Sequence, residues 1–174
     1  GMRLYFAESL ETFAADVQRA RPTIFFSVPR LWVKFQYGVH HKLPEPKLKL
    51  LLSIPIVSGL IRKKVLGALG LDQCRIACGG AAPMPVALLG WFRKLGLPVN
   101  EGYGMTENLA VSHLTVPGTN QEGSVGPAYE GVQVRIAPDN GEIQMRSPAV
   151  MLGYYKEPVL SREAMTDDGW LRTG

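Results

Sequence analysis

The fold is decided by residues 74–104, which read CRIACGGAAPMPVALLGWFRKLGLPVNEGYG. The apolar run 74–78 predicts a short strand, and the glycines and proline of 79–83 predict a tight turn. A helix is expected over 85–95, because proline suits the first helical position and a glycine follows the last one. Residues 97–101 predict a second strand. Strand, helix and strand in this order are typical of parallel neighbours in one sheet.

A helix and a strand are also predicted upstream of this unit. Residues 9–20 form the helix, with a serine at its start as the cap. The apolar positions at helical spacing are Leu10, Phe13, Ala14 and Val17. Residues 23–28 predict a strand buried on both faces and ended by a proline. Prolines interrupt residues 42–70, where we expect a basic, leucine-rich helix over 59–69.

The pattern changes after residue 123. Apolar and polar residues alternate over 132–136 and again over 142–146, and the Asp-Asn-Gly turn signal of 139–141 lies between them. We therefore expect an α/β fold, in which a parallel βαβ sheet portion is followed by an antiparallel β portion of the hairpin or barrel kind. The corresponding domains are residues 1–118 and 119–174.

Composition and charge narrow the class of protein. Apolar residues make up 46% and charged residues 20%, which is typical of a globular protein and not of a disordered one. Residues 1–70 hold 11 Lys and Arg against 4 Asp and Glu, whereas residues 71–174 hold 8 against 11. A basic half is either a solvated face or a surface for an anionic partner such as a membrane, a nucleotide or a nucleic acid.

The cysteines and the apolar runs indicate where in the cell the protein is expected. Cys74 and Cys78 have neither zinc nor CxxC redox spacing, so reduced core cysteines of a cytoplasmic protein are expected. The longest apolar run, residues 48–61, falls short of the ~20 residues that span a bilayer, and we expect no signal peptide from the first residues of the sequence. Peripheral contact at the inner face of the membrane is the other option, through the basic stretch 47–66.

Three loops follow predicted strands, at residues 28–32, 79–83 and 102–107. The carboxyl ends of parallel strands meet at one edge of a sheet, and ligands bind there. The residue types suit a nucleotide. Gly79 and Gly80 let a flat ring approach the backbone, while Tyr103 offers a stacking face. Thr106 offers a hydroxyl to a phosphate, and Glu107 a carboxylate oxygen to Mg²⁺.

Four motifs then carry a resemblance. YGMTE at 103–107 resembles the YGxTE motif of the adenylate-forming (AMP-binding) superfamily, and GGAAP at 79–83 resembles its adenine-side turn with one extra alanine. Residues 141–158 resemble its GEI…MxGYY..P motif. GWLRTG at 169–174 is similar to its GWxxTGD motif, cut before the aspartate. All four stand in the family's order.

The beginning of the chain narrows the resemblance. YFAES at 5–9 and the stretch 21–32, which ends in VPRLW, are similar to bacterial long-chain fatty acyl-CoA synthetases. The resemblance implies a central fragment of the large N-terminal domain. The phosphate loop would lie upstream, the ribose-binding aspartate would come next after Gly174, and the lid domain with the catalytic lysine would be missing. The segment 33–73 is shorter than in many such enzymes, which leaves the chain-length preference open.

By this resemblance the whole enzyme activates a long-chain fatty acid as acyl-AMP and transfers it to coenzyme A. Its cofactors and co-substrates would be ATP, Mg²⁺ and coenzyme A. The implied catalytic residues are Thr106 and Glu107, with Glu107 also the metal ligand. The implied nucleotide-binding residues are Gly79, Gly80, Ala81, Ala82, Gly102, Tyr103, Gly104, Met105 and Thr106. Trp32 would line the mouth of the acyl channel, or else pack in the core.

Two alternatives stay open from the sequence. The first is another adenylate-forming enzyme: an aryl- or short-chain acyl-CoA ligase, or a fatty acyl-AMP ligase that does not use coenzyme A. The second is a module that binds anionic lipid surfaces through residues 47–66. Nucleic acid is not expected as a partner, because the basic residues are not interleaved with aromatic ones and match no known module.

Overall fold

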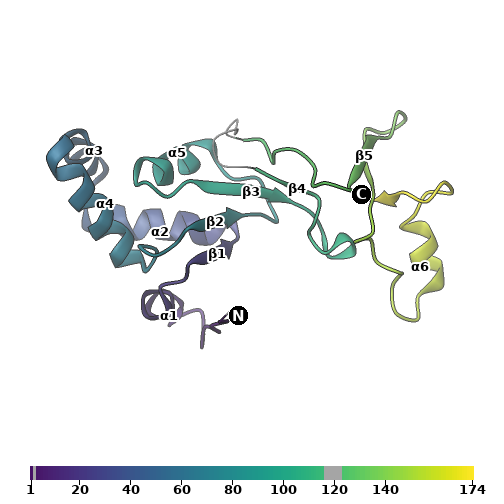
Figure 1. Cartoon of the computed structure of the whole chain (residues 1–174), viewed down its shortest axis with the longest axis horizontal. Helices are drawn as coiled ribbons and strands as arrows, with labels where there is room; N and C mark the ends of the chain where they lie inside the picture. The colour runs from purple at the N-terminus through teal and green to yellow at the C-terminus, as the bar shows by residue number, and fades with distance from the viewer. Residues whose placement is uncertain (2, 116–122) are drawn as a thin grey trace. The chain divides into compact units, whose positions relative to one another are not determined.

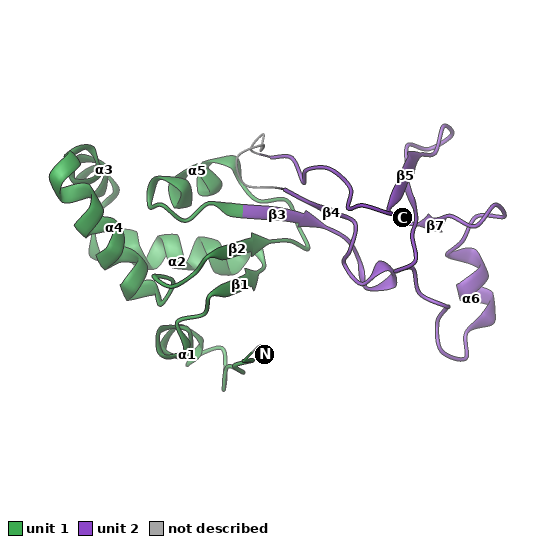
Figure 2. Cartoon of the chain, viewed as in Figure 1, with its two compact units in different colours: residues 1–99 green, residues 100–174 purple. Residues whose placement is uncertain are grey.

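The computed structural model describes residues 1, 3–115 and 123–174 of the chain. Figure 2 shows its two compact units, Gly1–Val99 (unit 1) and Asn100–Gly174 (unit 2). The division falls within a strand that begins at Val99. The predicted domain boundary at residues 118–119 lies outside the described residues.

Unit 1 contains most of the helices and a parallel pair of strands (Figure 1). Its elements are α1 (Phe13–Ala20), β1 (Ile24–Ser27), α2 (Pro29–Lys42), α3 (Glu45–Ser53), α4 (Pro55–Leu69), β2 (Ile76–Gly79), α5 (Val86–Lys94) and the start of β3 (Val99–Tyr103). Strands β1 and β2 pair in parallel, from Ile24 opposite Ile76 to Ser27 opposite Gly79. The predicted parallel α/β portion is thereby confirmed.

Aromatic side chains fill the core of unit 1. Trp32 and Phe92 are wholly buried, and their rings meet edge to face with centroids 4.8 Å apart. Phe25 of β1 meets Trp32 in the same way at 5.2 Å. Edge-to-face contacts suit aromatic rings, because the positive edge of one ring meets the negative face of the other. Helices α2 and α5 are thus packed with β1 through these three rings.

Three expectations for the beginning of the chain were wrong in detail. The helix α1 begins at Phe13, and Leu10 is exposed, because residues 9–12 form a turn in which the Ser9 hydroxyl accepts from the Thr12 amide at 3.1 Å. Strand β1 is buried on one face only, since Ile24 and Phe26 are more than half exposed. Residues 29–32, expected as a loop, are the first turn of α2, which accepts a proline at its start.

Two further predictions for unit 1 agree with the structure, whereas α3 lies where only proline interruptions were expected. The expected helix over 59–69 is all of α4 but its first four residues, and α3 packs beside α4. The predicted strand over 74–78 is β2, which begins two residues later and ends one residue later than expected. Cys74 and Cys78 are both reduced, and burial raises the pKa of the Cys74 thiol to about 11. Such a thiol stays protonated at neutral pH, which agrees with a core role.

Unit 2 is mainly antiparallel. Its elements after β3 are the 3₁₀ turn η1 (Thr106–Asn108), β4 (His113–Leu114), β5 (Gln133–Ile136), β6 (Ile143–Arg146), α6 (Pro158–Glu163) and β7 (Leu171–Arg172). Strands β5 and β6 form the predicted hairpin, with Gln133 opposite Arg146 and Ile136 opposite Ile143. Strand β7 adds to the free edge of β6, also antiparallel. The predicted antiparallel portion is confirmed.

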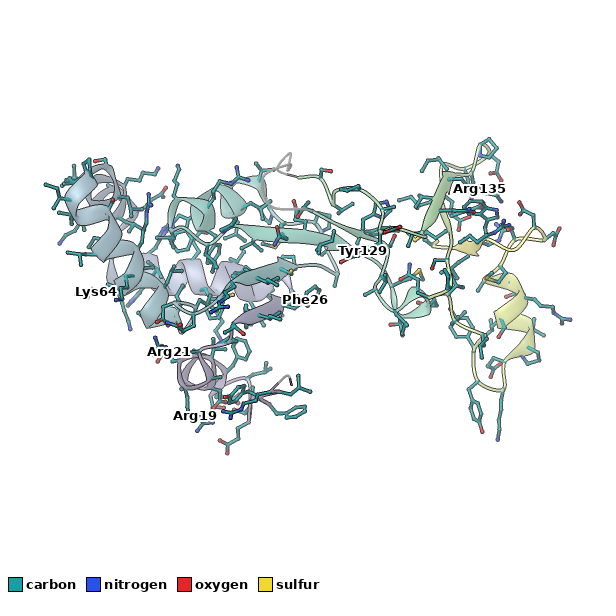
Figure 3. All side chains as sticks on the ribbon, in the orientation of Figure 1. Arg19, Arg21, Phe26, Lys64, Tyr129 and Arg135 are labelled. Carbon is teal, nitrogen blue, oxygen red and sulfur yellow. The ribbon has the colours of Figure 1, made fainter. Side chains whose placement is uncertain are left out.

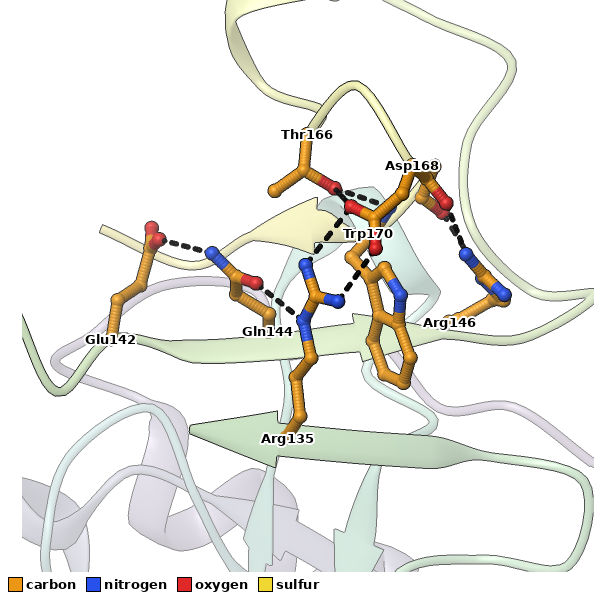
Figure 4. A network of polar contacts seen from close by, with 8 residues as sticks. Arg135, Glu142, Gln144, Arg146, Thr166, Asp168 and Trp170 are labelled. Carbon is orange, nitrogen blue, oxygen red and sulfur yellow. Dashed lines mark hydrogen bonds and ion pairs between the residues drawn. The ribbon is translucent and has the colours of Figure 1, made fainter. Parts of the chain in front are cut away.

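A polar network stabilises the three-stranded sheet on one side (Figure 4). Arg135 donates to both carboxylate oxygens of Asp168, at 2.6 and 3.0 Å. Arg135 therefore holds the pKa of Asp168 well below its usual range. The guanidinium groups of Arg135 and Arg146 also lie 4.5 and 4.7 Å from the centre of the Trp170 ring. Cation–π contacts of this kind stabilise a ring between two cations.

None of the helices in the described part of the chain combines the length and the apolar character needed to cross a membrane.

Candidate nucleotide site

The YGMTE loop begins at the carboxyl end of β3 in unit 2. Gly102 and Tyr103 still pair with β4, and the Tyr103 ring lies 5.9 Å from the His113 ring, centre to centre. Partial burial lowers the pKa of His113, so this imidazole is neutral near pH 7. Gly104 passes so close to Ala110 that an added Cβ would lie 2.6 Å from its backbone. The loop therefore requires glycine there.

Glu107 lies in η1 and is held from two sides. The Tyr154 hydroxyl donates to Glu107 Oε1 at 2.8 Å, and the Met151 amide donates to the Glu107 carbonyl at 2.7 Å. Donation to this carboxylate raises the pKa of Tyr154, because ionised tyrosine would lose the bond. No described residue donates to Glu107 Oε2, so one carboxylate oxygen remains for a ligand.

Thr106 precedes this carboxylate and is exposed. Its carbonyl accepts from the Leu109 amide at 3.1 Å, whereas its hydroxyl has no partner among the described side chains and backbone groups. A hydroxyl and a carboxylate on neighbouring residues can together bind a phosphate oxygen and its counter-ion.

The buried Asn108 side chain holds the turn η1 in place. Its Oδ1 accepts from the Met105 amide at 2.9 Å, and its Nδ2 donates to the Met145 sulfur at 3.2 Å. The Ser112 hydroxyl donates to the same sulfur at 3.0 Å. Asn108, Ser112 and Met145 are all almost fully buried. A thioether is a weak acceptor, so shape as well as hydrogen bonding keeps the loop on β6.

The backbone on both candidate loops is strained. Leu109 and Ala110, directly after η1, both have φ of +55°, and Ala81 in the other loop has φ of +67°. Residues other than glycine avoid this region, at a cost of about 1–3 kcal/mol each. Strain of this size persists where the surroundings hold it, and it clusters at ligand-binding loops.

The glycine turn of unit 1 leaves the end of β2. Gly79 and Gly80 are buried, and Ala81 and Ala82 are exposed. A Cβ on Gly79 would lie 2.9 Å from the sulfur of buried Met84, so this position accepts no side chain without a shift of Met84. The turn thus consists of two buried glycines followed by two exposed alanines.

Trp32 lies inside the aromatic core of unit 1. Its indole Nε1 donates to the Cys78 carbonyl at 3.3 Å, one residue before the glycine turn begins. The side chain has no exposed surface in the described chain. Core packing is therefore observed, and the acyl-channel role of Trp32 stays a prediction.

Within unit 2 the structure brings two separate motifs together. The motif at 103–107 and the motif at 141–158 meet through the bonds from Met151 and Tyr154 to Glu107. The glycine turn belongs to unit 1, so its approach to Tyr103 stays a prediction. Sequence reasoning missed Tyr154 and Asn108 as supports of the loop. The GYY signal pointed to Tyr154, but nothing in the sequence marked Asn108.

These features define a class: an α/β protein whose glycine-containing loops follow the carboxyl ends of strands β2 and β3. The chain belongs to the AMP-binding enzyme family, whose model matches residues 1–155. The sequence resemblance to the adenylate-forming superfamily is thereby confirmed.

Within this family, the chain is similar to several proteins named as fatty-acid–CoA ligases. The chain is 34% identical to fadD11 of Mycobacterium tuberculosis, a fatty-acid–CoA ligase by name, over 94% of this chain and 34% of that protein. It is 31% identical to long-chain-fatty-acid–CoA ligase 5 of Mus musculus, over 98% of this chain and 29% of that protein. The chain thus spans about a third of the length of the curated relatives it matches.

Solved structures agree with the fold. A malonyl-CoA ligase, solved as a product complex with methylmalonyl-CoA and AMP, matches 92% of this chain and 33% of its own, with a TM-score of 0.67 and 26% identity. The o-succinylbenzoate CoA synthetase of Bacillus subtilis matches 95% and 30%, with a TM-score of 0.65 and 22% identity. Both likenesses extend over nearly the whole chain.

Proposed function

We propose that the chain carries the adenine and metal loops of an ATP-dependent ligase that activates a long-chain fatty acid and transfers it to coenzyme A. The observation that carries the proposal is the setting of Glu107. Its carboxylate is oriented by Tyr154, follows the exposed Thr106 hydroxyl, and lies in a loop that begins at the end of a strand. The names of the relatives favour fatty acids as the substrate class.

Each loop has a part in this proposal. In the whole enzyme Gly79, Gly80, Ala81 and Ala82 would contact the adenine of ATP, and Gly102, Tyr103, Gly104 and Met105 would also belong to the nucleotide site. Tyr103 stacks on the base, for about 1–3 kcal/mol. Thr106 donates its hydroxyl to a phosphate oxygen of ATP. Trp32 supports the wall of the acyl channel from the core, through its hydrogen bond to the Cys78 carbonyl just before the glycine turn.

Glu107 fits a magnesium ligand. Mg²⁺ needs only one or two carboxylates when phosphate oxygens and water complete its shell, and one oxygen of Glu107 remains for it. No group of three or more His, Cys, Asp or Glu that could hold a metal occurs among the described residues. Phosphate oxygens of ATP and water would supply the other ligands. When bound, the ion neutralises charge that develops on the phosphates.

The proposed reaction has two steps. The fatty acid carboxylate attacks the α-phosphorus of ATP, and pyrophosphate leaves with the electrons of the broken P–O bond. The thiolate of coenzyme A then attacks the acyl carbon, and AMP leaves. Loops of this kind act by positioning and by charge stabilisation.

The same loops are compatible with other acids as substrates. They are also compatible with an acyl-AMP product that is never passed to coenzyme A. Assaying a panel of acids with and without coenzyme A separates these cases.

The decisive experiment replaces Glu107 by Gln in the longer enzyme that contains this chain. We expect ATP–pyrophosphate exchange to fall on the order of a thousandfold, because an amide oxygen is a poor ligand for Mg²⁺. Fatty acid binding should stay unchanged. Glu163→Gln, an exposed carboxylate on α6, is the matched control. Exchange within about threefold of the parent enzyme for Glu107→Gln would show that Glu107 is not the metal ligand.

A further inference from the structure

His113 is a histidine that the proposed function leaves unused, and it lies directly opposite Tyr103. Strands β3 and β4 pair antiparallel with these two residues in register. Side chains directly opposite each other in an antiparallel pair lie on the same face of the sheet. The centres of the two rings are 5.9 Å apart, and their planes are inclined by 50°. The separation lies within the range in which aromatic rings attract each other.

No polar contact holds the Tyr103 side chain. Among the residues that the structure describes, its hydroxyl forms no hydrogen bond, and the ring of His113 is the one aromatic ring that it meets. A tyrosine ring turns about two side-chain torsions, so without a restraint it adopts several orientations. A stacking face needs one of them, and ordering the ring in advance lowers the cost of binding. His113 is placed to supply this restraint.

The imidazole of His113 is itself held in place from the core. Ser112 is wholly buried, and its Oγ lies 2.7 Å from His113 Nδ1 and 3.0 Å from the Met145 sulfur. A thioether has no hydrogen to donate, so the hydroxyl donates to the sulfur and accepts from the Nδ1–H of His113. Partial burial lowers the pKa of His113, which favours the neutral ring with this single N–H. The hydrogen bond thus fixes both the tautomer and the orientation of the ring.

The backbone at Ser112 is fixed as well. The amide of Tyr129, a residue labelled in Figure 3, donates to the Ser112 carbonyl at 2.8 Å. Met145, the other partner of the serine hydroxyl, is almost fully buried in β6. An unbroken series of contacts therefore joins the core at Met145 to the ring of Tyr103.

We propose that His113 is a positioning residue of the nucleotide site, and that its ring holds Tyr103 in the orientation that stacks on the base of ATP. The inference rests on the proposed function, because His113 acts through Tyr103 and touches no substrate itself. A restraint of this kind strengthens binding of the nucleotide and leaves the chemical step alone. Loss of the His113 ring should therefore raise the KM for ATP without lowering kcat.

The test measures ATP–pyrophosphate exchange, and the dissociation constant of the fluorescent analogue mant-ATP, with the longer enzyme that contains this chain. His113→Ala should raise the KM for ATP and the dissociation constant about 2- to 12-fold, which is what one aromatic pair contributes. Its kcat should stay within about twofold of the parent value. His113→Phe keeps a ring opposite Tyr103 and should recover most of the lost affinity. His41→Ala, at an exposed histidine of α2, is the matched control and should change neither constant.

A double-mutant cycle separates positioning from a purely structural role. In a Tyr103→Ala background, His113→Ala should weaken mant-ATP binding no further, because the ring that it positions is gone. Additive losses in this cycle, a matching fall in kcat, or a His113→Phe variant no better than His113→Ala would overturn the proposal. Thermal denaturation of each variant confirms that it folds.

The Tyr103→Ala variant also distinguishes this inference from the proposed function. Unchanged mant-ATP binding in Tyr103→Ala would remove Tyr103 from the nucleotide site, and the role of His113 with it. Weakened binding in Tyr103→Ala beside parent-like binding in His113→Ala would overturn the role of His113 alone.

Discussion

The two units of this chain bury different kinds of side chain. The main apolar cluster of the structure runs from Val17 to Val99 and so belongs wholly to unit 1. Among the described residues of unit 2, the buried apolar side chains are Ala137, Met145 and Leu171. Buried polar residues outnumber them there: Asn100, Glu101, Asn108, Ser112, Thr115 and Gln144.

The two kinds of burial have different effects: apolar burial stabilises the fold, whereas hydrogen bonds fix the positions of particular groups. Apolar burial is non-directional and proportional to area, so the core of unit 1 supplies stability without fixing any one atom. Hydrogen bonds to buried polar groups are directional, and each one left unmade costs about 1–3 kcal/mol. Unit 2 therefore gains less from burial but fixes the YGMTE loop at defined distances. Glu107, the candidate catalytic carboxylate, lies in unit 2, where hydrogen bonds fix the position of its loop.

The largest effect is expected from the core of unit 1. Phe92→Ala removes a wholly buried ring that packs on Trp32, and should lower the free energy of unfolding by about 3–5 kcal/mol. Urea denaturation followed by circular dichroism measures it. Ile56→Ala, at a side chain 89% exposed, should change stability by less than about 0.5 kcal/mol. Similar losses in the two variants would remove the distinction between core and surface.

A smaller, local effect is expected in unit 2. Asn108→Ala leaves the Met105 amide without its acceptor and should cost about 1–3 kcal/mol. Hydrogen exchange should speed up at the amides of residues 105–111 and remain slow in α5. The control, Asn140→Ala, removes an exposed turn contact to the Glu142 amide. If Asn108→Ala accelerated exchange throughout unit 1 as well, the two units would not be separate in stability.

The third prediction concerns the support of Glu107. In the longer enzyme Tyr154→Phe removes the 2.8 Å bond to the carboxylate, and should slow adenylation about 2- to 12-fold, for a loss of about 0.5–1.5 kcal/mol. Tyr155→Phe is the neighbouring control, because Tyr155 is exposed and its ring contact with Lys156 survives in phenylalanine. Unchanged rates for Tyr154→Phe would mean that Glu107 needs no such support.

The smallest effect is a pH dependence in unit 1. The Arg21 guanidinium lowers the pKa of Asp72 from its model-compound value of 3.8 to about 2. A carboxyl with a lowered folded-state pKa stabilises the fold above its unfolded pKa, and this contribution is lost as pH falls from about 4 to about 2. Asp72→Asn should make the denaturation midpoint depend less on pH over that range. The control variant Asp167→Asn, at an exposed side chain, should leave the pH dependence unchanged. The change is small, since the arginine is half exposed.

The sequence predicts those parts of the fold that depend on local patterns. The hairpin β5–β6 is one, because period-two alternation and the Asp-Asn-Gly turn lie within one short stretch. Helix α2 was missed, although Trp32, Phe35 and Val39 have helical spacing, because Pro29 was interpreted as the end of a strand and not as the start of a helix. A proline permits both interpretations.

The candidate site is predictable in its residues but not in its supports. Motif order alone indicates Tyr103, Thr106 and Glu107. The bond from Tyr154 to Glu107 joins positions 47 apart, and that from Asn108 to Met145 joins positions 37 apart. Neither pairing leaves a periodic or compositional signal, because it depends on how β6 and the turn after β3 meet in space.

The three tryptophans make the two units optically separable. Trp32 and Trp91 are buried in unit 1, whereas Trp170 lies in unit 2 between the guanidinium groups of Arg135 and Arg146. An indole between two cations reports its surroundings through its emission, so a chain with phenylalanine at positions 32 and 91 would show tryptophan emission from unit 2 alone. The converse variant, with Trp170 replaced by phenylalanine, would show tryptophan emission from unit 1 alone. Each unit thus contains its own intrinsic fluorophore.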